Sequence, residues 1–313
     1  MGQRRLKTWA TPSADGQGRR RARPGNIRGV THRWPRALVL TLLGLTVAMP
    51  VRAGADGTPL VADAWARFRS VRSEREELVF LIVSAPQAAR FSRADADAVL
   101  HGGANVTHKR AVRTVRFADD GHDKIHVLFS APPDDAGTGF LIWRQPGLAQ
   151  DDQWVFVPGL PNARRISASS TQSFMGTDLI YEDVRELAGE RTERFAYELA
   201  GQEPVDGRTC TLVVATPRPG VSSAYSSRKI WFDGESHLPL QIEFYDEPGH
   251  LRKIMRTGAP HAITPTAYRA DFTEVRDLTL DEVTLILTTQ RTVGVDLPAA
   301  MFTQDYLLHP TGE

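Results

Sequence analysis

The sequence predicts a mainly β fold of the α+β class, in which one large, strongly curved antiparallel sheet is incompletely covered by helices. Three observations lead to this prediction. Around ten short runs of strand-forming residues are separated by turn signals such as Glu247-Pro248-Gly249. The run at residues 239–245 alternates polar and apolar side chains. Leu240, Ile242 and Phe244 share one face, and this period of two is typical of a sheet with one dry and one wet face. Helical patterns, by contrast, are few and short.

The expected elements follow one another along the chain without an internal repeat or a linker. A first short helix is expected at residues 61–68, where apolar side chains recur at helical spacing. Strands are then expected at residues 78–83, 106–117, 125–129, 140–143, 154–157, 194–199, 208–215, 226–232, 239–245, 251–257 and 282–291. A second helix is expected at residues 174–187, with Thr177 or Asp178 as its N-cap. The polar, Ala-rich residues 89–105 are interpreted as an insertion.

A sheet of this size must cover its dry face. Closure into a barrel, a second sheet or a helix could each cover this face. Neither of the two expected helices is long enough to seal an open sheet tightly. The sequence therefore predicts an apolar hollow against the sheet, of the kind that takes a hydrophobic ligand.

Residues 1–53 are interpreted as a secretory signal peptide with an extended basic N-terminal region. A basic flank at Arg36 precedes an apolar run at residues 37–49, and small residues follow it, with cleavage expected near Ala53. The apolar run has 13 residues, fewer than the roughly 20 that a membrane-spanning helix needs. Twin-arginine export and a start codon placed too far upstream are the two explanations for the long basic region. Residues 54–313 are expected to form a single exported domain.

Charge and cysteine content exclude several classes of protein. The first 53 residues hold 11 of the 38 Lys and Arg and one of the 37 acids, so the remainder carries a net charge of about −9 with His neutral. This charge argues against nucleic acid and anionic lipid surfaces as the main partners. Cys210 is the single cysteine, so no intramolecular disulfide forms, and we interpret it as a small buried apolar residue.

No catalytic signature occurs in the sequence, so we expect a protein that is not an enzyme and that holds neither a metal nor a cofactor. It has no Gly-x-Ser-x-Gly elbow, no His-Glu-x-x-His pair, no phosphate-binding glycine loop and no paired cysteine motif. The eight histidines after residue 53 are scattered and mostly near turns, which indicates solvated loop residues. The acidic pairs at residues 134–135 and 151–152 have too few neighbouring oxygen ligands for calcium and are interpreted as turn acids.

The segment 151–184 carries most of the functional signal. Trp154 and Phe156 share one face of an expected strand, either as ordinary core or as a cavity wall. After a Pro-Gly-x-Pro turn, Arg164 and Arg165 are expected to face opposite ways, so that one of them reaches inward. An inward arginine needs an acidic partner, and the helical segment that follows offers Asp178, Glu182 and Asp183. Such a bond would hold a lid shut until a ligand displaced it; a plain structural ion pair is the alternative.

These same residues resemble the central signature of the LolA-like outer-membrane lipoprotein-sorting proteins. The resemblance is carried by residues 154–158 (WVFVP), 164–167 (RRIS) and 174–183 (FMGTDLIYED), and it extends over roughly residues 120–308. Before residue 120 the chain departs from the pattern. The resemblance implies an unclosed antiparallel β-barrel with a helical lid. It also implies an apolar interior that carries lipid or the acyl chains of lipoproteins across the periplasm, in some members beside an inner-membrane transporter of the resistance-nodulation-division (RND) class.

The first hypothesis is therefore a periplasmic carrier for outer-membrane sorting or lipid transport. Its expected ligand-binding residues are aromatic and flexible apolar side chains with two charged residues at the cavity mouth: Trp143, Trp154, Phe156, Arg165, Phe174, Met175, Asp178, Tyr181, Trp231 and Phe244. Two alternatives remain open. One is an accessory protein of an envelope transporter, with a fully packed sheet; the other is a secreted hydrolase with an unrecognised site.

Overall fold

A computed structural model describes residues 53–84, 88–91, 106–167, 170–247 and 249–310. All of them fall in the unit formed by residues 49–313. The signal peptide expected at residues 1–53, except Ala53, and nearly all of the insertion expected at residues 89–105 lie outside the described residues. The domain boundary at residue 54 stays a prediction.

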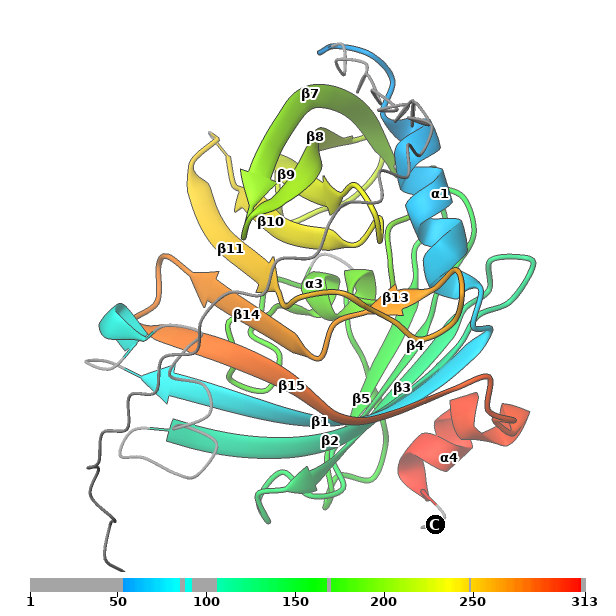
Figure 1. Cartoon of the computed structure of the whole chain (residues 1–313). Helices are drawn as coiled ribbons and strands as arrows, with labels where there is room; N and C mark the ends of the chain where they lie inside the picture. The colour runs from blue at the N-terminus through cyan, green and yellow to red at the C-terminus, as the bar shows by residue number, and fades with distance from the viewer. Residues whose placement is uncertain (1–52, 85–87, 92–105, 168–169, 248, 311–313) are drawn as a thin grey trace, which may run out of the picture. The chain divides into compact units, whose positions relative to one another are not determined.

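One antiparallel sheet of 13 strands dominates the fold, in the order β6-β5-β4-β3-β2-β1-β15-β14-β11-β10-β9-β8-β7. Its strands are β1 (Ser73–Ser84), β2 (Val106–Arg116), β3 (Lys124–Ala131), β4 (Gly139–Trp143), β5 (Asp152–Phe156), β6 (Arg164–Arg165), β7 (Phe195–Val205), β8 (Arg208–Pro217), β9 (Ser227–Asp233), β10 (Pro239–Tyr245), β11 (Leu251–Thr257), β14 (Phe272–Asp277) and β15 (Glu282–Val293). β12 (His261–Ala262) and β13 (Tyr268–Arg269) form a separate pair. The sheet curves strongly around a short helix, and its end strands β6 and β7 do not pair with each other (Figure 1). The expected fold class, mainly β with an unclosed, curved antiparallel sheet, is confirmed.

Few helices accompany the sheet: α1 (Thr58–Arg69), α3 (Tyr181–Glu186), α4 (Gln304–Leu308) and the 3₁₀ turns η1 (Ala88–Arg90) and η3 (Ala299–Phe302). α1 contains the helix expected at residues 61–68 and begins with a proline in its first turn, where the missing N–H costs nothing. It buries Val61 and Ala64 against the inner face of the sheet.

α3 is much shorter than the helix expected at residues 174–187. The prediction is therefore wrong for the first part of that range. Met175 and Gly176 take left-handed φ angles of 56° and 71°, and such residues cannot continue a helix. The helix begins after Ile180, not after Thr177 or Asp178. Its N-terminus is stabilised by the Asp183 carboxylate, which accepts a hydrogen bond of 2.9 Å from the Ile180 N–H.

Alternation along the strands divides the buried residues between two faces. On β1, Leu78 and Phe80 join the main core on the inner, concave side, whereas Val79 and Leu81 belong to a smaller outer cluster. The strand β10 departs from simple alternation, because its pairing with β9 shifts register between Pro239 and Gln241. The prediction that Leu240 shares a face with Ile242 and Phe244 is therefore wrong, since Leu240 packs in an outer cluster.

No helix within the described ranges is long and apolar enough to cross a membrane.

Candidate ligand-binding cavity

A cavity of about 170 Å³ lies on the inner face of the sheet, against α3 and the turn before it. Most of its wall is apolar and is contributed by α1, α3, the segments next to α3, and the strands β1, β3, β10, β11 and β15. The apolar lining residues are Phe68, Leu78, Phe80, Val127, Phe174, Leu179, Val184, Leu187, Leu238, Ile242, Met255 and Ile286. The inner face of the sheet is thus not fully covered by the chain's own side chains, which is the condition that a hydrophobic ligand requires.

The register of three neighbouring strands sets the order of residues along this wall. Phe80 of β1 lies opposite Ile286 of β15. Two residues earlier on β1, Leu78 lies between Ala111 of β2 and Thr288 of β15. On β1 and β15 these rows supply a wall that is apolar except for one hydroxyl, because side chains at i and i+2 point to the same face of a strand. On β2, Lys109 lies opposite Phe80 and pairs with Asp135.

The next row along β1 is charged. Glu76 lies between Arg113 of β2 and Arg291 of β15, and all three side chains line the cavity. Arg291 Nε donates to Glu76 Oε1 at 2.9 Å, and Arg113 Nε lies 2.8 Å from Glu76 Oε2. Arg269, from β13, also lines the cavity and donates through Nε and Nη2 to the buried carboxylate of Glu74. The cavity therefore has an apolar part and one charged end.

Burial and pairing act differently on the two carboxylates at this end. Burial raises the pKa of Glu76, although Arg113 opposes the shift. Burial also disfavours the charge of Glu74, but the guanidiniums of Arg269, Arg113 and Arg291 together outweigh it and lower the pKa of that carboxyl. Glu74 is thus the firmly ionised member of the pair.

Although α3 sits inside the curved sheet, two of its carboxylates make buried polar bonds to neighbouring elements. Asp183 pairs with Lys253 of β11 at 2.6 Å and accepts a hydrogen bond of 2.9 Å from the Tyr225 hydroxyl. Glu182 accepts hydrogen bonds of 2.7 Å from the Ser223 hydroxyl and from the Ala224 N–H. These bonds tie α3 to β11 and to the segment before β9.

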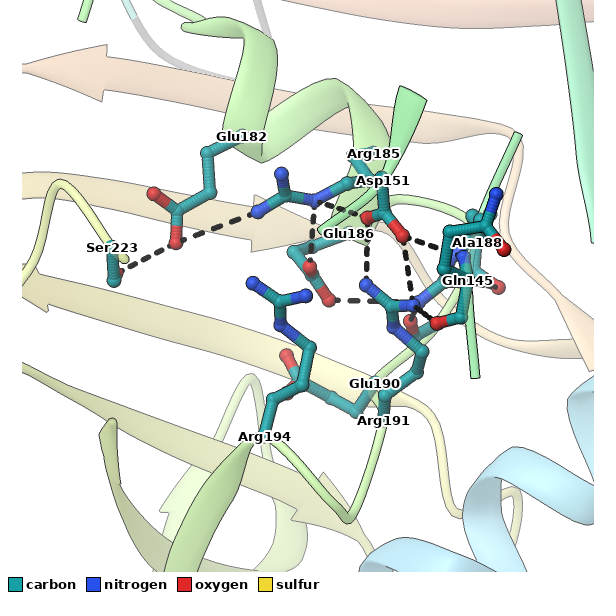
Figure 2. A network of polar contacts seen from close by, with 12 residues as sticks. Gln145, Asp151, Glu182, Arg185, Glu186, Ala188, Glu190, Arg191, Arg194 and Ser223 are labelled. Atoms are coloured by element: carbon teal, nitrogen blue, oxygen red, sulfur yellow. Dashed lines mark hydrogen bonds and ion pairs between the residues drawn. The ribbon is translucent and has the colours of Figure 1, made fainter. Parts of the chain in front are cut away.

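Arg185 and Glu186 of α3 belong to a network of arginines and carboxylates that also includes Glu182, shown in Figure 2. Arg185 Nε donates to Glu186 at 3.1 Å and lies 3.2 Å from Asp151. Arg191 binds Asp151 through two hydrogen bonds of 2.9 and 2.6 Å. Burial opposes the charge of Glu186, but the guanidiniums led by Arg185 outweigh it and lower its pKa to about 2. Glu186 also lines the cavity, so this network reaches its wall.

Only one of the ten residues expected to bind a ligand, Phe174, is among the residues that line the cavity. Three more lie in the same core without lining the cavity: Met175 and Tyr181 pack against the buried residues there, and Phe244 stacks on Tyr225. Asp178 is buried and fixes the turn before α3, accepting hydrogen bonds from the Thr284 hydroxyl and the Asp277 N–H at 2.7 and 3.0 Å. Burial raises the pKa of this carboxyl.

Four of the expected residues lie on the outer face of the sheet. Trp143, Trp154 and Phe156 pack beneath the C-terminal residues of η3 and α4, and the Trp143 indole donates to the Phe302 carbonyl at 2.9 Å. Trp231 packs with Cys210, and its indole donates to Glu203 at 2.9 Å. Cys210 is free and buried, as predicted. The ligand-binding role assigned to these four residues stays a prediction, and their contacts here are with the protein itself.

Arg165 does not bond to the segment around α3. Its guanidinium pairs with Asp152 on the neighbouring strand, and its side chain is 67% exposed. The expected latch between Arg165 and Asp178, Glu182 or Asp183 is therefore wrong, and the alternative of a structural ion pair describes the residue. The partner of Asp183 is Lys253, a residue that the sequence analysis did not single out.

One histidine departs from the expected solvated loop position. His126 lies on β3, is 3% exposed and meets the ring of Tyr306 edge-on. Burial lowers its pKa to about 4, so it is neutral above that pH. Within the residues that the structure describes, no group of three or more His, Cys, Asp or Glu side chains is arranged to hold a metal ion.

The charged end of the cavity was missed because its signal is weak. Glu74 and Glu76 are in phase with Leu78 and Phe80 on β1, so they occupy the dry face of that strand. A charge on a dry face is a sign of a buried partner. On β2, however, the basic residues are too many for Arg113 to stand out, and only the register reveals it.

The comparisons with known proteins agree with this architecture. A protein-family model described as "Uncharacterized protein" matches residues 121–309. A crystal structure of an outer-membrane lipoprotein-sorting protein domain from Vibrio parahaemolyticus superposes with a TM-score of 0.70 at 21% identity, covering 81% of this chain and 98% of that one. A DUF1329 family protein from Desulfovibrio piger gives a TM-score of 0.68 at 26% identity, with 81% and 100% covered. A LolA superfamily protein from Nitrosomonas europaea gives 0.58 at 18%, with 80% and 99% covered. Among curated proteins, none matches the chain.

The unclosed sheet with a cavity against its inner helix defines a LolA-like class of protein. The family model spans more than half of the chain, and the three solved structures share the fold over nearly their whole length. The chain belongs to the family that this model describes, and its fold is LolA-like.

Proposed function

We propose that the protein is a non-catalytic periplasmic carrier that binds lipid, or the acyl chains of lipoproteins, for outer-membrane sorting or lipid transport. One observation carries the proposal: the inner face of the sheet holds a mainly apolar cavity of about 170 Å³ beside a short helix. Such a cavity suits a flexible hydrocarbon chain, because burial of apolar area drives binding without the need for a specific polar partner. The name of the Vibrio parahaemolyticus structure agrees with this ligand class.

The segment Ser173–Glu186 is proposed as the lid of the cavity. It contributes Phe174, Leu179, Val184 and Glu186 to the wall. Hydrogen bonds and ion pairs fix the segment, and water can replace these when the segment moves outward. Burial of Phe174, Leu179 and Val184 in the main core also fixes it, and contacts with a bound acyl chain can replace those apolar contacts. By the family resemblance, an inner-membrane transporter of the RND class is the proposed partner for loading or release.

Identification of co-purified lipid tests the carrier proposal. Protein purified gently from its native host should retain lipid that native mass spectrometry detects and that solvent extraction releases. Delipidated protein should then take up a fluorescent fatty acid. Consistently empty protein that takes up no fluorescent fatty acid would contradict the proposal and favour an accessory role. Cross-linking and co-purification from native membranes test the transporter separately.

A further inference from the structure

The charged end of the cavity contains one arginine whose bonding capacity is not used. Arg269 and Arg291 each donate hydrogen bonds through Nε and both Nη groups. Arg113 Nε lies 2.8 Å from Glu76 Oε2, but within the described residues neither atom has a hydrogen-bond partner. Within the described part of the chain, the two Nη groups of Arg113 have no hydrogen-bond acceptor, although the side chain is only 11% exposed and lines the cavity. A guanidinium with free donors in a largely buried place needs an acceptor.

The charges around Arg113 allow that acceptor to be an anion. Three guanidiniums, those of Arg113, Arg269 and Arg291, face two buried carboxylates, those of Glu74 and Glu76. Asp271 also pairs with Arg291, but it lies at the rim and is 53% exposed, so water screens its charge. The buried part of this end therefore carries one positive charge in excess when both glutamates are ionised.

Arg113 lies next to the apolar part of the cavity along the strand β2. Its neighbour two residues along the inner face of β2 is Ala111, which lies opposite Leu78. Phe80 and Lys109 form the next row, and the ammonium group of Lys109 is paired with Asp135. Consecutive rows on one face of a strand are about 6.6 Å apart. A ligand whose anionic group binds Arg113 can thus extend a hydrocarbon chain within the same cavity. This chain would pass over Ala111 toward Phe80 and Phe174.

We infer that Arg113 binds the anionic head group, a carboxylate or a phosphate, of a single acyl lipid whose chain fills the apolar rows of the cavity. The two Nη groups of an arginine present parallel donors that match two oxygens of either group. This inference rests on the proposed carrier function and narrows its ligand class. A neutral lipid of equal chain length lacks the group that Arg113 recognises.

Titration of delipidated protein with matched ligands tests this inference. The probes are hexadecanoic acid, its methyl ester, a lysophosphatidic acid of the same chain length, and inorganic phosphate. We expect the acid and the lysophosphatidic acid to bind about tenfold or more tightly than the ester, because charge-assisted hydrogen bonds are lost in the ester. Displacement of the acid by inorganic phosphate alone would overturn the assignment to a lipid, since the site would then recognise a free anion.

Three variants locate the effect at Arg113. Arg113→Gln should reduce the preference for acid over ester to about twofold or less while leaving ester affinity unchanged. The double variant Glu76→Gln/Arg113→Gln removes both charges of the pair and keeps the test valid if the single variant is unstable. Arg116→Gln, on the same strand but exposed on its opposite face, is the control and should keep the full preference. Near-ultraviolet circular dichroism verifies that each variant is folded.

The outcomes separate the inference from the function on which it rests. If the wild type binds acid and ester equally, or if Arg113→Gln keeps the preference, the head-group assignment is wrong and the carrier proposal survives. If the wild type binds neither lipid, the carrier proposal itself fails.

Discussion

Lys253 and Asp183 form an ion pair of 2.6 Å between Nζ and Oδ2, and neither side chain is exposed to solvent. Lys253 points inward from β11, and Asp183 belongs to α3, 70 residues earlier. The second carboxylate oxygen accepts a hydrogen bond from Tyr225. The pair therefore joins the short helix to the sheet at the place where the cavity wall is formed. Charges so deeply buried are stable only together, because each neutralises the other in a medium that does not solvate them.

We predict that Lys253→Met destabilises the protein by about 3–5 kcal/mol, because it leaves the Asp183 carboxylate buried without its cation. The double variant Lys253→Met/Asp183→Asn should lose distinctly less, since no uncompensated charge remains. Arg256→Met, at an exposed position on the opposite face of β11, serves as the control and should change stability by less than about 1 kcal/mol. Urea unfolding curves measure all three. Equal losses in the single and double variants would show that the unpaired charge of Asp183 does not cause the loss of stability.

A second prediction concerns the volume of the cavity. Ile242→Trp places a larger side chain in the cavity wall, so we expect it to weaken fatty-acid binding about tenfold or more by occupying the space of the acyl chain. The matched control is Ile254→Trp on the adjacent strand, where alternation directs the side chain to the outer face. Displacement of a fluorescent fatty acid gives both affinities. Unimpaired binding by Ile242→Trp would place the ligand elsewhere.

A third prediction concerns the C-terminal residues that cover the outer face of β4 and β5. Leu307 is fully buried against Trp154 and its neighbours. Leu307→Ala should therefore cost about 2–5 kcal/mol, as expected for a large-to-small change in a core. Leu308→Ala, at a half-buried position, should cost less. Thermal unfolding followed by tryptophan fluorescence measures both losses.

The Leu307→Ala variant also tests whether the outer cluster around Trp154 is structural or binds a ligand. The folded Leu307→Ala protein should bind fatty acid within about twofold of the wild type, because its cluster lies on the opposite face of the sheet from the cavity. A large loss of affinity without loss of structure would instead support the ligand-binding role expected for Trp143, Trp154 and Phe156.

The sequence pattern predicted correctly that a curved sheet forms. It predicted less well which side chains lie on each face of that sheet. Alternation assigned Ile242 and Phe244 to the dry face correctly, because burial imposes a period of two on a regular strand. It failed at Leu240, where a register shift reverses the side chain. The strand β14 was missed, since five of its six residues are only half-buried or polar and the run FTEVRD has little apolar signal.

The candidate site was harder to predict than the fold. Trp143 and Trp154 were assigned to the cavity because aromatic residues mark a wall, but a sequence does not show which face of an open sheet is concave. Here the C-terminal residues supply a second apolar layer on the convex face. Lys253 and Arg113 gave no signal, since a lysine or arginine on a strand is usually solvated. Their roles depend on partners 70 and 37 residues away.

The buried His126 leads to a prediction about pH. Its pKa is lowered by burial from 6.5 to about 4, so the unfolded chain binds a proton at a pH where the folded protein does not. The stability of the wild type should therefore be complete above pH 6.5 and should fall as the pH drops toward 4, by about 3 kcal/mol in total from this group. Carboxylates also titrate near the lower end of this range, and a variant is needed to separate them.

The His126→Gln variant lacks the titrating imidazole of His126 and keeps all the carboxylates of the wild type. The difference in unfolding free energy between the wild type and this variant should shift by about 3 kcal/mol, to the disadvantage of the wild type, between pH 7 and pH 4. His122→Gln is the control, because the His122 side chain is 50% exposed, and its difference from the wild type should stay nearly constant. Urea unfolding at a series of pH values measures both. A constant difference for His126→Gln would show that His126 binds a proton as readily in the folded protein as in the unfolded chain, and that burial does not lower its pKa.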